Sequence, residues 1–555
     1  MTNNKKITVA EYLLARLKSL NVDHVFGIPG DYILPFFEIM VDNEIEQIAA
    51  CNELNAGYAA DGYARIRGLG AAAVTYGPGS FSIINAVAGA YSEEVPIVII
   101  SGGPATSAYK SRPILHHLML EKYETSVNIF KNITAYANLL DQVDTVCTEI
   151  DKALSICFAE KRPVFLEIPT DIQLTMVDAP MSELDFSTYL KTDREAGRLA
   201  AATLANKILQ SKRTVILPGH EIHRWGLQEK VKEILELTNI PAASVFVGKA
   251  DFLEHQENCL GSYQGAGSPP AVREYVEAAD TVVLLGMVPS DFNLGGFTAK
   301  LSTQQCVTIW NDKAEIEGET IENVSIVDVV NELLERLPEN IMAKDEQAPV
   351  QVFSHMPDDT YSPEADTPIT NKRFYDRLVN FFEDDDIILA DAGCAINITH
   401  LQLPKNSTYI ASCYWASIGM AFGATLGACF AAKKGQRVIA VEGDGSFQMT
   451  AQELSSMARY AKPTIVFVVN NKGYTAERLI HDGPFNDIPE WKYHKLPEAF
   501  GGGEGIDVHN EEELEAAMVK ASAHKGPGPL LIEVHVDPWD ASEAFILMSE
   551  VLRSH

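Results

Sequence analysis

Cysteines spaced as in a metal site or a disulfide framework are missing from this sequence. The chain has 555 residues and eight cysteines, which are scattered without a C-x-x-C pair. Structural zinc sites and disulfide frameworks both need cysteines at close, repeated spacings, so neither is indicated. We expect the cysteines to be reduced and buried.

Positive charge and long apolar runs are also scarce. The 44 Lys and Arg residues are outnumbered by 76 Asp and Glu residues, which gives a formal charge of -32. Such a field repels nucleic-acid phosphates and anionic membranes, so no nucleic-acid partner is expected. No apolar run reaches the ~20 residues of a membrane-spanning helix. The polar residues 1–6 lead directly into an amphipathic helix without an apolar signal segment, so we expect a cytoplasmic protein that does not associate with membranes.

Length and composition indicate several ordinary globular domains. A chain of this length is too long for one hydrophobic core, and 46% hydrophobic with 22% charged residues is a usual balance for a folded protein. Apolar strand-like runs alternate with helical patterns, which favours parallel sheets covered by helices on both faces. We predict an α/β protein with three doubly wound parallel-sheet domains over residues 1–180, 190–345 and 369–555, and a linker over 346–368. The predicted strands cover residues 48–51, 71–75, 97–100, 164–168, 214–217, 281–285, 306–310, 387–390, 437–441, 464–469 and 530–534.

The most informative segment is a strand, turn, helix and strand in the third domain. Residues 443–446, Gly-Asp-Gly-Ser, end the first strand, and residues 470–473, Asn-Asn-Lys-Gly, end the second. A right-handed crossover brings both strand ends to one edge of the sheet, so Asp444 and Asn471 can meet there. A carboxylate, an amide oxygen and a backbone carbonyl near Gly473 suit Mg²⁺. The small residues that let backbone N–H groups approach an anion are Gly443, Gly445 and Ser446.

Each half of this pattern alone is a common turn sequence, whereas both halves at neighbouring strand ends are far more specific. A P-loop is excluded because no Gly-Lys-Ser/Thr follows the glycines. A nicotinamide oxidoreductase is disfavoured because no G-x-G-x-x-G opens the helix. Thr450 and Glu453 fit a capping box, which predicts that the intervening helix starts there.

The two motif halves together resemble the thiamine diphosphate motif. Segments 471–477 and 480–486 closely resemble pyruvate and indolepyruvate decarboxylases, and the similarity spans nearly the whole chain. The sequence is thus similar to the thiamine diphosphate-dependent 2-oxo acid decarboxylases, which include phenylpyruvate decarboxylases. The resemblance implies cleavage of a 2-oxo acid to an aldehyde and CO₂, with pyrimidine-binding, central and diphosphate-binding domains in that order. It also implies that Mg²⁺ is held by Asp444, Asn471 and the carbonyl of Gly473.

The resemblance assigns proton transfer to five side chains. Glu53 follows a strand and opens an Ala- and Gly-rich helix, where a lone glutamate ordinarily only compensates the helix dipole. In the family it shares a proton with N1′ of the cofactor's aminopyrimidine. Adjacent histidines ordinarily point in different directions, but imidazole suits proton transfer because it titrates near neutral pH. The residues implied to handle protons around the substrate are Asp31, His116, His117 and Glu477.

Residues 414–420 resemble the family loop that bends the cofactor into a V shape. This implies that Ile418 is the wedge and that the carbonyl of Ala416 accepts a hydrogen bond from N4′, although an apolar residue at a turn is ordinarily core. The substrate pocket is expected to be wide, because Ile396 and Ala476 are smaller than their counterparts in pyruvate-restricted members. Aromatic and branched 2-oxo acids are therefore expected as substrates alongside pyruvate, since each buried CH₂ contributes ~0.8 kcal/mol. The other residues expected to line the pocket are Phe292, Ile480 and Phe545.

The resemblance also implies an assembly, because in this family Glu53 and Asp444 of one active centre come from different subunits. We expect a homo-oligomer, a dimer of dimers, that binds a small-molecule 2-oxo acid. Two other classes stay open. A carboligase such as acetohydroxyacid synthase shares Glu53 and the metal motif but binds FAD, and a catalytically silent scaffold needs only the fold. The histidine pair and Glu477 argue against the carboligase, and intact Glu53, His117 and Glu477 argue against the scaffold.

Overall fold

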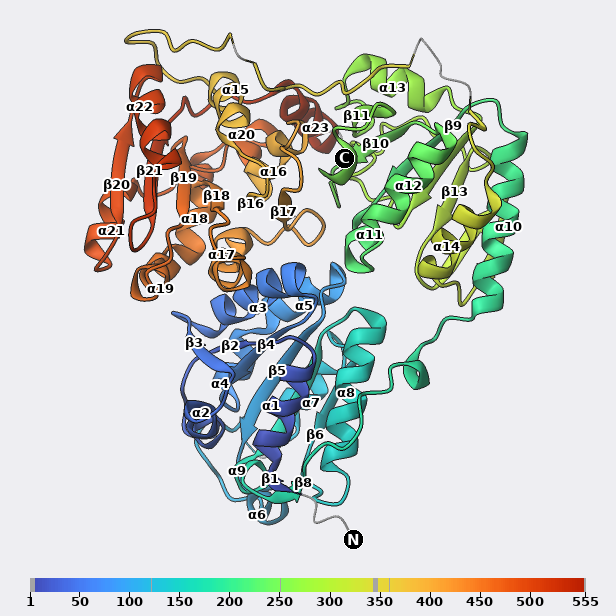
Figure 1. Cartoon of the computed structure of the whole chain (residues 1–555). Coiled ribbons are helices and arrows are strands. Elements are labelled where there is room, and N and C mark those ends of the chain that lie inside the picture. The colour runs from blue at the N-terminus through green and yellow to red at the C-terminus, as the bar shows by residue number, and fades with distance from the viewer. Residues whose placement is uncertain (1–4, 121, 250, 343–347, 359, 554–555) are drawn as a thin grey trace.

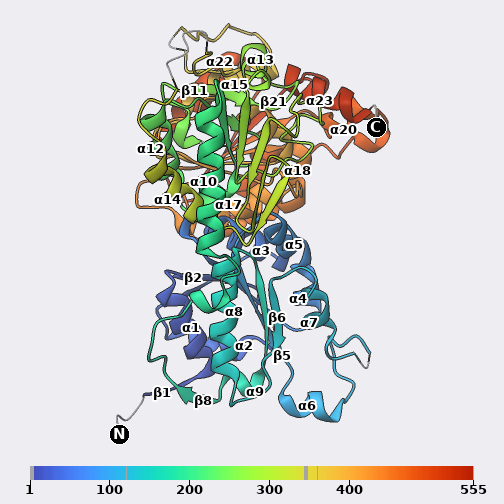
Figure 2. The ribbon, with the colours of Figure 1, turned by 90° about the vertical axis from the view of Figure 1, so that its right-hand side faces the viewer.

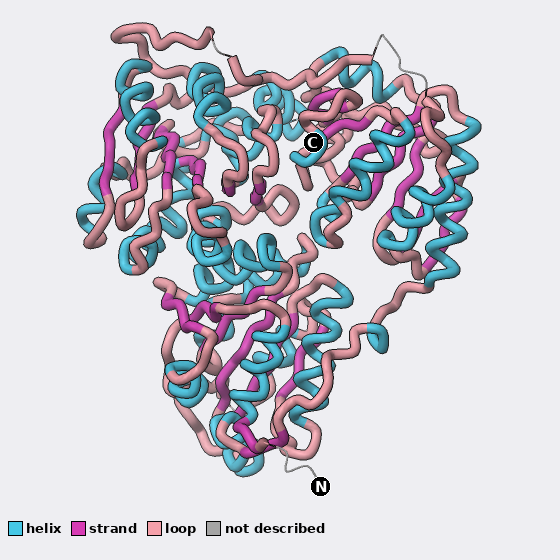
Figure 3. Tube along the Cα trace, viewed as in Figure 1, coloured by secondary structure: helices cyan, strands magenta, loops and turns pink. Residues whose placement is uncertain are grey.

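The computed structural model describes residues 5–120, 122–249, 251–342, 348–358 and 360–553. Three large sheets follow one another along the chain, in blue, green and orange to red in Figure 1. Strands lie at the centre of each unit with helices around them (Figure 3). The predicted α/β class with three parallel-dominated sheets is confirmed. The domain boundaries stay predictions, and residues 1–4, 343–347 and 554–555, where some of them fall, lie outside the described part of the chain.

The N-terminal sheet is entirely parallel, with strand order β3-β2-β4-β5-β7-β6. Its strands are β2 (His24–Gly27), β3 (Glu46–Ala49), β4 (Gly70–Val74), β5 (Ile97–Gly103), β6 (Tyr136–Leu139) and β7 (Val164–Pro169). The helices around it are α1 (Val9–Ser19), α2 (Leu34–Val41), α3 (Glu53–Arg67), α4 (Pro78–Ser82), α5 (Ile84–Ser92), α6 (Thr106–Ser111), α7 (Thr125–Phe130), α8 (Val146–Glu160) and α9 (Thr170–Gln173). Strands β4 and β5 are buried along their whole length, so they read as continuous apolar runs. A small antiparallel pair, β1 (Lys6–Thr8) with β8 (Met176–Asp178), joins the two ends of this unit.

The central sheet is mixed, with strand order β11-β10-β9-β12-β13-β14-β15. Its strands are β9 (Thr214–Pro218), β10 (Ala242–Val245), β11 (Cys259–Tyr263), β12 (Thr281–Leu285), β13 (Cys306–Ile309), β14 (Lys313–Ile316) and β15 (Glu319–Glu322). Its helices are α10 (Arg194–Gln210), α11 (His220–Arg224), α12 (Gln228–Thr238), α13 (Pro270–Glu277) and α14 (Ile326–Arg336). Helices α10 and α14 pack together on one face (Figure 2).

The last two strands of the central sheet are antiparallel, unlike the predicted doubly wound arrangement. The turn between β14 and β15 is Glu317-Gly318, with φ of 55° and 82°. Positive φ at both residues is typical of a two-residue hairpin turn, and a parallel crossover needs roughly 10–12 residues. The connection is therefore a hairpin, and β14 and β15 add an antiparallel edge to a sheet whose other strand pairs are parallel.

The C-terminal sheet is parallel, with strand order β17-β16-β18-β19-β21-β20. Its strands are β16 (Ile387–Ala390), β17 (Thr408–Ala411), β18 (Val438–Gly443), β19 (Ile465–Asn470), β20 (Glu504–Val508) and β21 (Leu530–His535). Its helices are α15 (Asn371–Phe381), α16 (Ala392–Thr399), α17 (Met420–Ala431), α18 (Asp444–Thr450), α19 (Leu454–Arg459), α20 (Thr475–Ile480), α21 (Leu496–Ala499), α22 (Glu511–Ser522) and α23 (Glu543–Arg553). Every strand predicted from the sequence overlaps an observed strand.

The helix between β18 and β19 begins earlier than the capping box predicts. Helix α18 starts at Asp444, inside the motif itself, and a 3₁₀ turn separates it from α19. Thr450 Oγ1 donates to the carbonyl of Gly419, and Glu453 accepts from Asn55 Nδ2. The prediction was wrong because both side chains are buried and hold distant segments together.

The N-terminal and C-terminal units meet where helix α3 of the first packs against helix α17 of the second (Figure 1). A Cβ on Gly62 would lie 2.3 Å from the carbonyl oxygen of Ala424, and one on Gly427 would lie 1.8 Å from that of Ala59. Only glycine allows backbones to approach this closely. Buried residues of both units form one hydrophobic cluster at this contact, so the two sheets share a core.

Two expectations from composition concern cysteines and membranes. All eight cysteines are free, but only four are buried and Cys51 is exposed, so the expectation of buried cysteines holds for half of them. No helix in the described ranges is long and apolar enough to cross a membrane.

Candidate active site

The predicted metal motif lies at the carboxyl edge of the C-terminal sheet. Strands β18 and β19 are parallel neighbours that end at Gly443 and Asn470. Asp444 is buried, and its carboxylate accepts from the N–H of Gly445 at 2.7 Å and the N–H of Gly473 at 3.0 Å. The two motif halves, 27 residues apart in sequence between Asp444 and Asn471, therefore touch.

Three polar groups converge at the metal motif, namely the Asp444 carboxylate, the Asn471 side-chain amide and the Gly473 carbonyl. The side-chain oxygen of Asn471 lies 3.1 Å from Asp444 Oδ1 and 2.8 Å from the carbonyl oxygen of Gly473. Octahedral Mg²⁺ with ligands at ~2.0–2.1 Å sets neighbouring oxygens about 2.9 Å apart, which matches these spacings. Without a cation, the opposite amide orientation satisfies all partners, because Nδ2 then donates to Asp444 and Gly473 and Oδ1 accepts from Thr475 Oγ1. A cation held by Asp444 and Gly473 would instead require the side-chain oxygen of Asn471 to face it. The residues present fit Mg²⁺.

Carboxyl groups at this sheet edge lie in a desolvated environment. Burial raises the pKa of Asp444 to about 7, although backbone N–H groups partly offset the effect. Burial also raises the pKa of Asp391 to about 6 and that of Glu442 well above its usual value. A divalent cation beside such groups favours their ionised form. The edge is therefore suited to binding a cation.

Small residues leave room beside the motif for an anion. A Cβ on Gly443 would meet only Ser446 Oγ, at 3.7 Å, whereas one on Gly445 would lie 2.4 Å from the ring of Tyr474. Ser446 Oγ donates to the carbonyl of Gly443 at 3.0 Å. Backbone N–H groups in such a turn can approach a phosphate closely.

A cavity of about 300 Å³ opens at this edge. Its lining contains the predicted metal, cofactor and pocket residues of the central and C-terminal units, together with Glu477. These residues are Phe292, Ile396, Ala416, Ile418, Gly443, Asp444, Gly445, Ser446, Asn471, Gly473, Ala476, Glu477, Ile480 and Phe545.

One wall of the cavity is apolar. The rings of Phe246 and Phe292 stack with centroids 5.3 Å apart, and Ile396 and Phe545 are buried. Ala476 packs against the same cluster. The cavity thus has a charged end at the metal motif and an apolar end, which suits a ligand with a charged group and an apolar part.

The loop after β17 lines the cavity in an unusual backbone conformation. Ala416 has a φ of 53°, in the left-handed region that non-glycine residues rarely adopt. Ile418 is 40% exposed and lines the cavity, so it is not a core residue as its type alone suggests. Asp391 accepts from the N–H groups of Gly419 and Ala421 at 2.8 and 3.2 Å and so fixes the loop. Sequence reasoning gave Asp391 no role, although its position directly after β16 places it at this same edge.

Arg478 was also missed from the sequence. It is buried, donates to the carbonyls of Asn471 and Lys472, and pairs with Asp487 at 2.9 Å. These bonds hold the turn that carries the carbonyl of Gly473, which is predicted to bind the metal. An arginine beside Glu477 in a short helix gives no sequence signal that distinguishes it from a surface residue.

The predicted proton-transfer residues of the N-terminal unit lie after β2, β3 and β5. Glu53 is the first residue of α3, which Asn52 caps. Its Oε1 lies 3.4 Å from the position that a Cβ on Gly79 would occupy. A Cβ on Gly77, whose φ is 73°, would lie 2.3 Å from the carbonyl oxygen of His117. The glycine turn after β4 therefore lets Glu53 and His117 approach it from two sides.

Both histidines of the pair approach one carboxylate. His116 Nε2 lies 2.7 Å from Asp31 Oδ2, and His117 Nδ1 lies 3.9 Å from Asp31 Oδ1. The His116 ring stacks on Tyr32 with centroids 5.3 Å apart. His117 has a φ of 65°, and this backbone conformation brings the side chains of His116 and His117 toward the carboxylate of Asp31. The ordinary arrangement, in which adjacent histidines point apart, is therefore not the one found here.

The two groups of predicted residues do not share this cavity within one chain. Its described lining comes from the central and C-terminal units and contains none of Glu53, Asp31, His116 and His117. Glu453 accepts from Asn55 Nδ2 at 2.7 Å and from the N–H of Cys51 at 3.2 Å, which ties the start of α3 to the C-terminal unit. The structure thus forms two half-sites, one at each sheet edge.

Glu93 is a buried link between the N-terminal unit and the cavity loop. Its Oε1 accepts from the N–H groups of Tyr414 and Trp415 at 3.1 and 2.9 Å, and Oε2 pairs with Arg65 at 2.8 Å. Burial alone would raise the pKa of Glu93, but Arg65 and these N–H groups outweigh it, so the pKa is lowered. The resulting negative charge fixes the start of the loop that carries Ala416 and Ile418.

Models of thiamine pyrophosphate enzymes match most of the chain. The N-terminal TPP binding domain matches residues 7–126, the central domain 201–337 and the C-terminal TPP binding domain 391–534. A pyruvate decarboxylase of Aspergillus fumigatus is 32% identical over 560 residues, covering 99% of this chain and 98% of its own length. Pyruvate decarboxylase isozyme 1 of Saccharomyces cerevisiae is 34% identical over 506 residues, or 89% of each chain. Pyruvate decarboxylase 1 of Arabidopsis thaliana is 32% identical over 549 residues, covering 97% of this chain and 90% of its own length.

Proposed function

Because this chain belongs to the thiamine diphosphate-dependent 2-oxo acid decarboxylases, we propose that its two half-sites together form the active centre of that reaction. The chain is a carboxy-lyase that uses thiamine diphosphate with Mg²⁺ to convert a 2-oxo acid to an aldehyde and CO₂. The observation that carries the site assignment is the convergence of the Asp444 carboxylate, the Asn471 amide and the Gly473 carbonyl beside a cavity with an apolar wall.

The C-terminal half-site holds the metal and the diphosphate. Asp444, Asn471 and the carbonyl of Gly473 would hold Mg²⁺, which would neutralise the charge of the diphosphate. Backbone N–H groups of residues 443–446 bind phosphate oxygens directly. When bound, thiamine diphosphate would supply a nucleophilic carbon for the ketone of the substrate and a thiazolium ring that accepts the electron pair released with CO₂. The Ala416–Ile418 segment orients the cofactor rings from the cavity wall.

The N-terminal half-site moves protons. Glu53 exchanges a proton between its carboxylate and N1′ of the aminopyrimidine. Asp31 Oδ2 and His116 Nε2 share a hydrogen bond at 2.7 Å, so a proton can pass between them. His117 lies beside the same carboxylate, and Glu477 supplies a carboxylate from the cavity side. These four groups protonate the product and orient the substrate carboxylate.

We propose that a complete centre needs two chains, since the half-sites do not share a cavity in one chain. A second copy would present its N-terminal sheet edge to this cavity, and two-fold symmetry would give two centres per dimer. We extend this to the dimer of dimers expected for the family.

The reaction is tested with a panel of 2-oxo acids in a coupled alcohol dehydrogenase assay. Aldehyde is expected only when thiamine diphosphate and Mg²⁺ are both supplied, and the purified protein should be colourless. A flavin spectrum would favour the carboligase alternative instead. Protein that binds the cofactor but releases no CO₂ from any 2-oxo acid would favour a silent scaffold.

Removal of the metal at mildly alkaline pH is expected to release thiamine diphosphate. The pKa of Asp444 is raised only to about 7, so at pH values near 8 its carboxylate is ionised and repels the diphosphate once the cation is gone. Near pH 6 the carboxyl group binds a proton, which weakens this repulsion. Cofactor loss on chelation should therefore be greater at the higher pH, as measured in gel-filtered protein that elemental analysis shows to be free of metal. Cofactor retained after exhaustive chelation at the higher pH would contradict the bridging role of Mg²⁺.

We propose that the pocket accepts aromatic and branched 2-oxo acids as well as pyruvate. The support is the small Ala476 in an apolar wall that includes Phe292, Ile396 and Phe545. Ala476→Ile fills this space, and at ~0.8 kcal/mol per buried CH₂ the kcat/KM for phenylpyruvate relative to pyruvate should fall at least about tenfold. Ala523→Ile, at an exposed position outside the cavity, is the matched control. A wild-type preference for pyruvate of about tenfold or more, or an unchanged ratio in Ala476→Ile, would overturn the proposal.

A further inference from the structure

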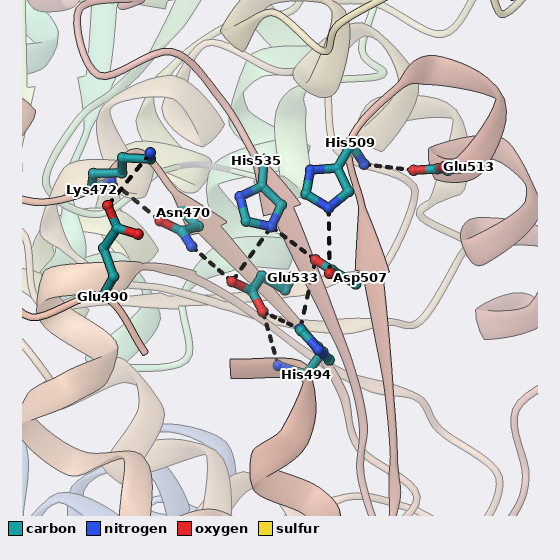
Figure 4. A network of polar contacts seen from close by, with 9 residues as sticks. All are labelled: Asn470, Lys472, Glu490, His494, Asp507, His509, Glu513, Glu533 and His535. Carbon is teal, nitrogen blue, oxygen red and sulfur yellow. Dashed lines mark hydrogen bonds and ion pairs between the residues drawn. The ribbon is translucent and has the colours of Figure 1, made fainter. Parts of the chain in front are cut away.

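Three histidines and two carboxylates gather beside β20 and β21, outside the cavity described above (Figure 4). One of the five side chains lies in β20 and a second directly follows that strand. Two more lie near the end of β21, and the fifth comes from the 3₁₀ turn Tyr493–Lys495. The five are His494, Asp507, His509, Glu533 and His535.

Strand periodicity explains why four of these side chains share one face. Residues 506–509 read Ile-Asp-Val-His, and residues 532–535 read Ile-Glu-Val-His. Asp507 is paired with Glu533 in the parallel register of β20 and β21. Because side chains alternate along a strand, the acidic residue and the histidine of each segment point the same way, while the two valines are buried in the core. The same short motif therefore stands side by side on two strands.

Asp507 is at the centre of the cluster. Its Oδ1 lies 2.8 Å from His535 Nε2 and 3.6 Å from His494 Nδ1, and its Oδ2 lies 3.3 Å from His509 Nε2. In a tetrahedral zinc site with bonds of ~2.0–2.1 Å, ligand atoms lie about 3.3 Å apart. The ligand atoms of Asp507, His509 and His535 all lie within 4.8 Å of one another. A cation of this size therefore needs only small side-chain movements.

The surroundings favour a metal over a simple ion-pair network. Glu533 is 2% exposed, lies 2.6 Å from His494 Nδ1 and 3.5 Å from His535 Nε2, and accepts from Asn470 Nδ2 at 2.7 Å. A buried carboxylate beside His494 and His535 therefore adds to Asp507 at this cluster, and two carboxylates among histidines favour a bound cation. His509 is 58% exposed, so its ring can leave its stack on His535 and turn toward an incoming ion.

We propose that Asp507, His509 and His535 bind one transition-metal cation, with Zn²⁺ as the probe, while Glu533 and His494 border the site. Two imidazoles and a carboxylate favour such an ion over Mg²⁺, which prefers oxygen ligands alone. The site is distinct from the magnesium motif but linked to it. Glu533 accepts from Asn470, and the next residue, Asn471, is a proposed ligand of Mg²⁺.

The test uses the full chain loaded with thiamine diphosphate and excess Mg²⁺, so that the proposed magnesium site at Asp444 and Asn471 is filled. After dialysis against Zn²⁺ and gel filtration, about one additional zinc per chain is expected, with a higher Tm because the ion binds only the folded state. Co²⁺ in place of Zn²⁺ should give a tetrahedral spectrum without a sulfur charge-transfer band. A sulfur band would assign the ion to a cysteine and overturn the proposal.

Variants locate the ion. His509→Gln and Asp507→Asn should each weaken zinc binding at least about tenfold and remove the Tm increase, while CO₂ release stays unchanged. His509 is exposed, so its substitution leaves the fold intact. His524→Gln is the control, because His524 precedes the opposite end of β21 and contacts the carbonyl of Gly528 instead. Equal zinc binding by wild type, both ligand variants and the control would show an ion-pair network with adventitious metal only.

Discussion

Glu53→Gln is expected to fold and to bind thiamine diphosphate but to lose most of its activity. The amide has nearly the shape of the carboxylate, but it cannot exchange a proton with N1′. General acid–base catalysis contributes about 10²–10⁴-fold, so kcat should fall by that order. The measurement is CO₂ release at saturating cofactor, with cofactor binding and Tm recorded on the same protein.

The control for this variant is Glu46→Gln. Glu46 lies on β3, the strand that precedes Glu53, but it is exposed. Loss of its charge should leave turnover and Tm nearly unchanged. If Glu53→Gln retained turnover close to wild type, Glu53 would not be the group that activates the cofactor, whatever its position in the half-site.

The parts of the fold that sequence predicts well are those set by local pattern. Buried parallel strands such as β4 and β5 show unbroken apolar runs, and Asp444 and Asn471 stand where such runs end. A right-handed crossover then leaves little freedom for where the two residues meet. For these reasons the two halves of the predicted metal motif can be placed at one sheet edge from the sequence alone.

Other features depend on contacts that no local pattern encodes. Glu453 matches a helix cap in sequence, yet it accepts hydrogen bonds from Cys51 and Asn55 of another unit. The direction of the histidine pair depends on the positive φ of His117, beside the glycine turn that contains Gly77. Each of these outcomes is set by a partner far away in sequence. Residue type and spacing therefore identify the chemistry more readily than the contacts that position it.

Co-expression of Glu53→Gln with Glu477→Gln is expected to restore activity that neither variant has alone. Glu53 belongs to the N-terminal half-site and Glu477 lines the cavity of the C-terminal half-site. In a mixed dimer, one centre combines both altered halves, and the other combines both intact halves. Random pairing makes half of the dimers mixed, so about a quarter of wild-type centres should be active if each centre draws on two chains.

The matched control places both changes in the same half-site. Co-expression of Glu53→Gln with His116→Asn should restore nothing, because in every dimer each centre then receives one altered N-terminal half. The two mixtures contain the same amount of Glu53→Gln and differ only in which half-site the second change occupies. If each centre were built from a single chain, neither mixture would recover activity. Recovery in the first mixture alone therefore requires that Glu53 and Glu477 of one centre belong to different chains.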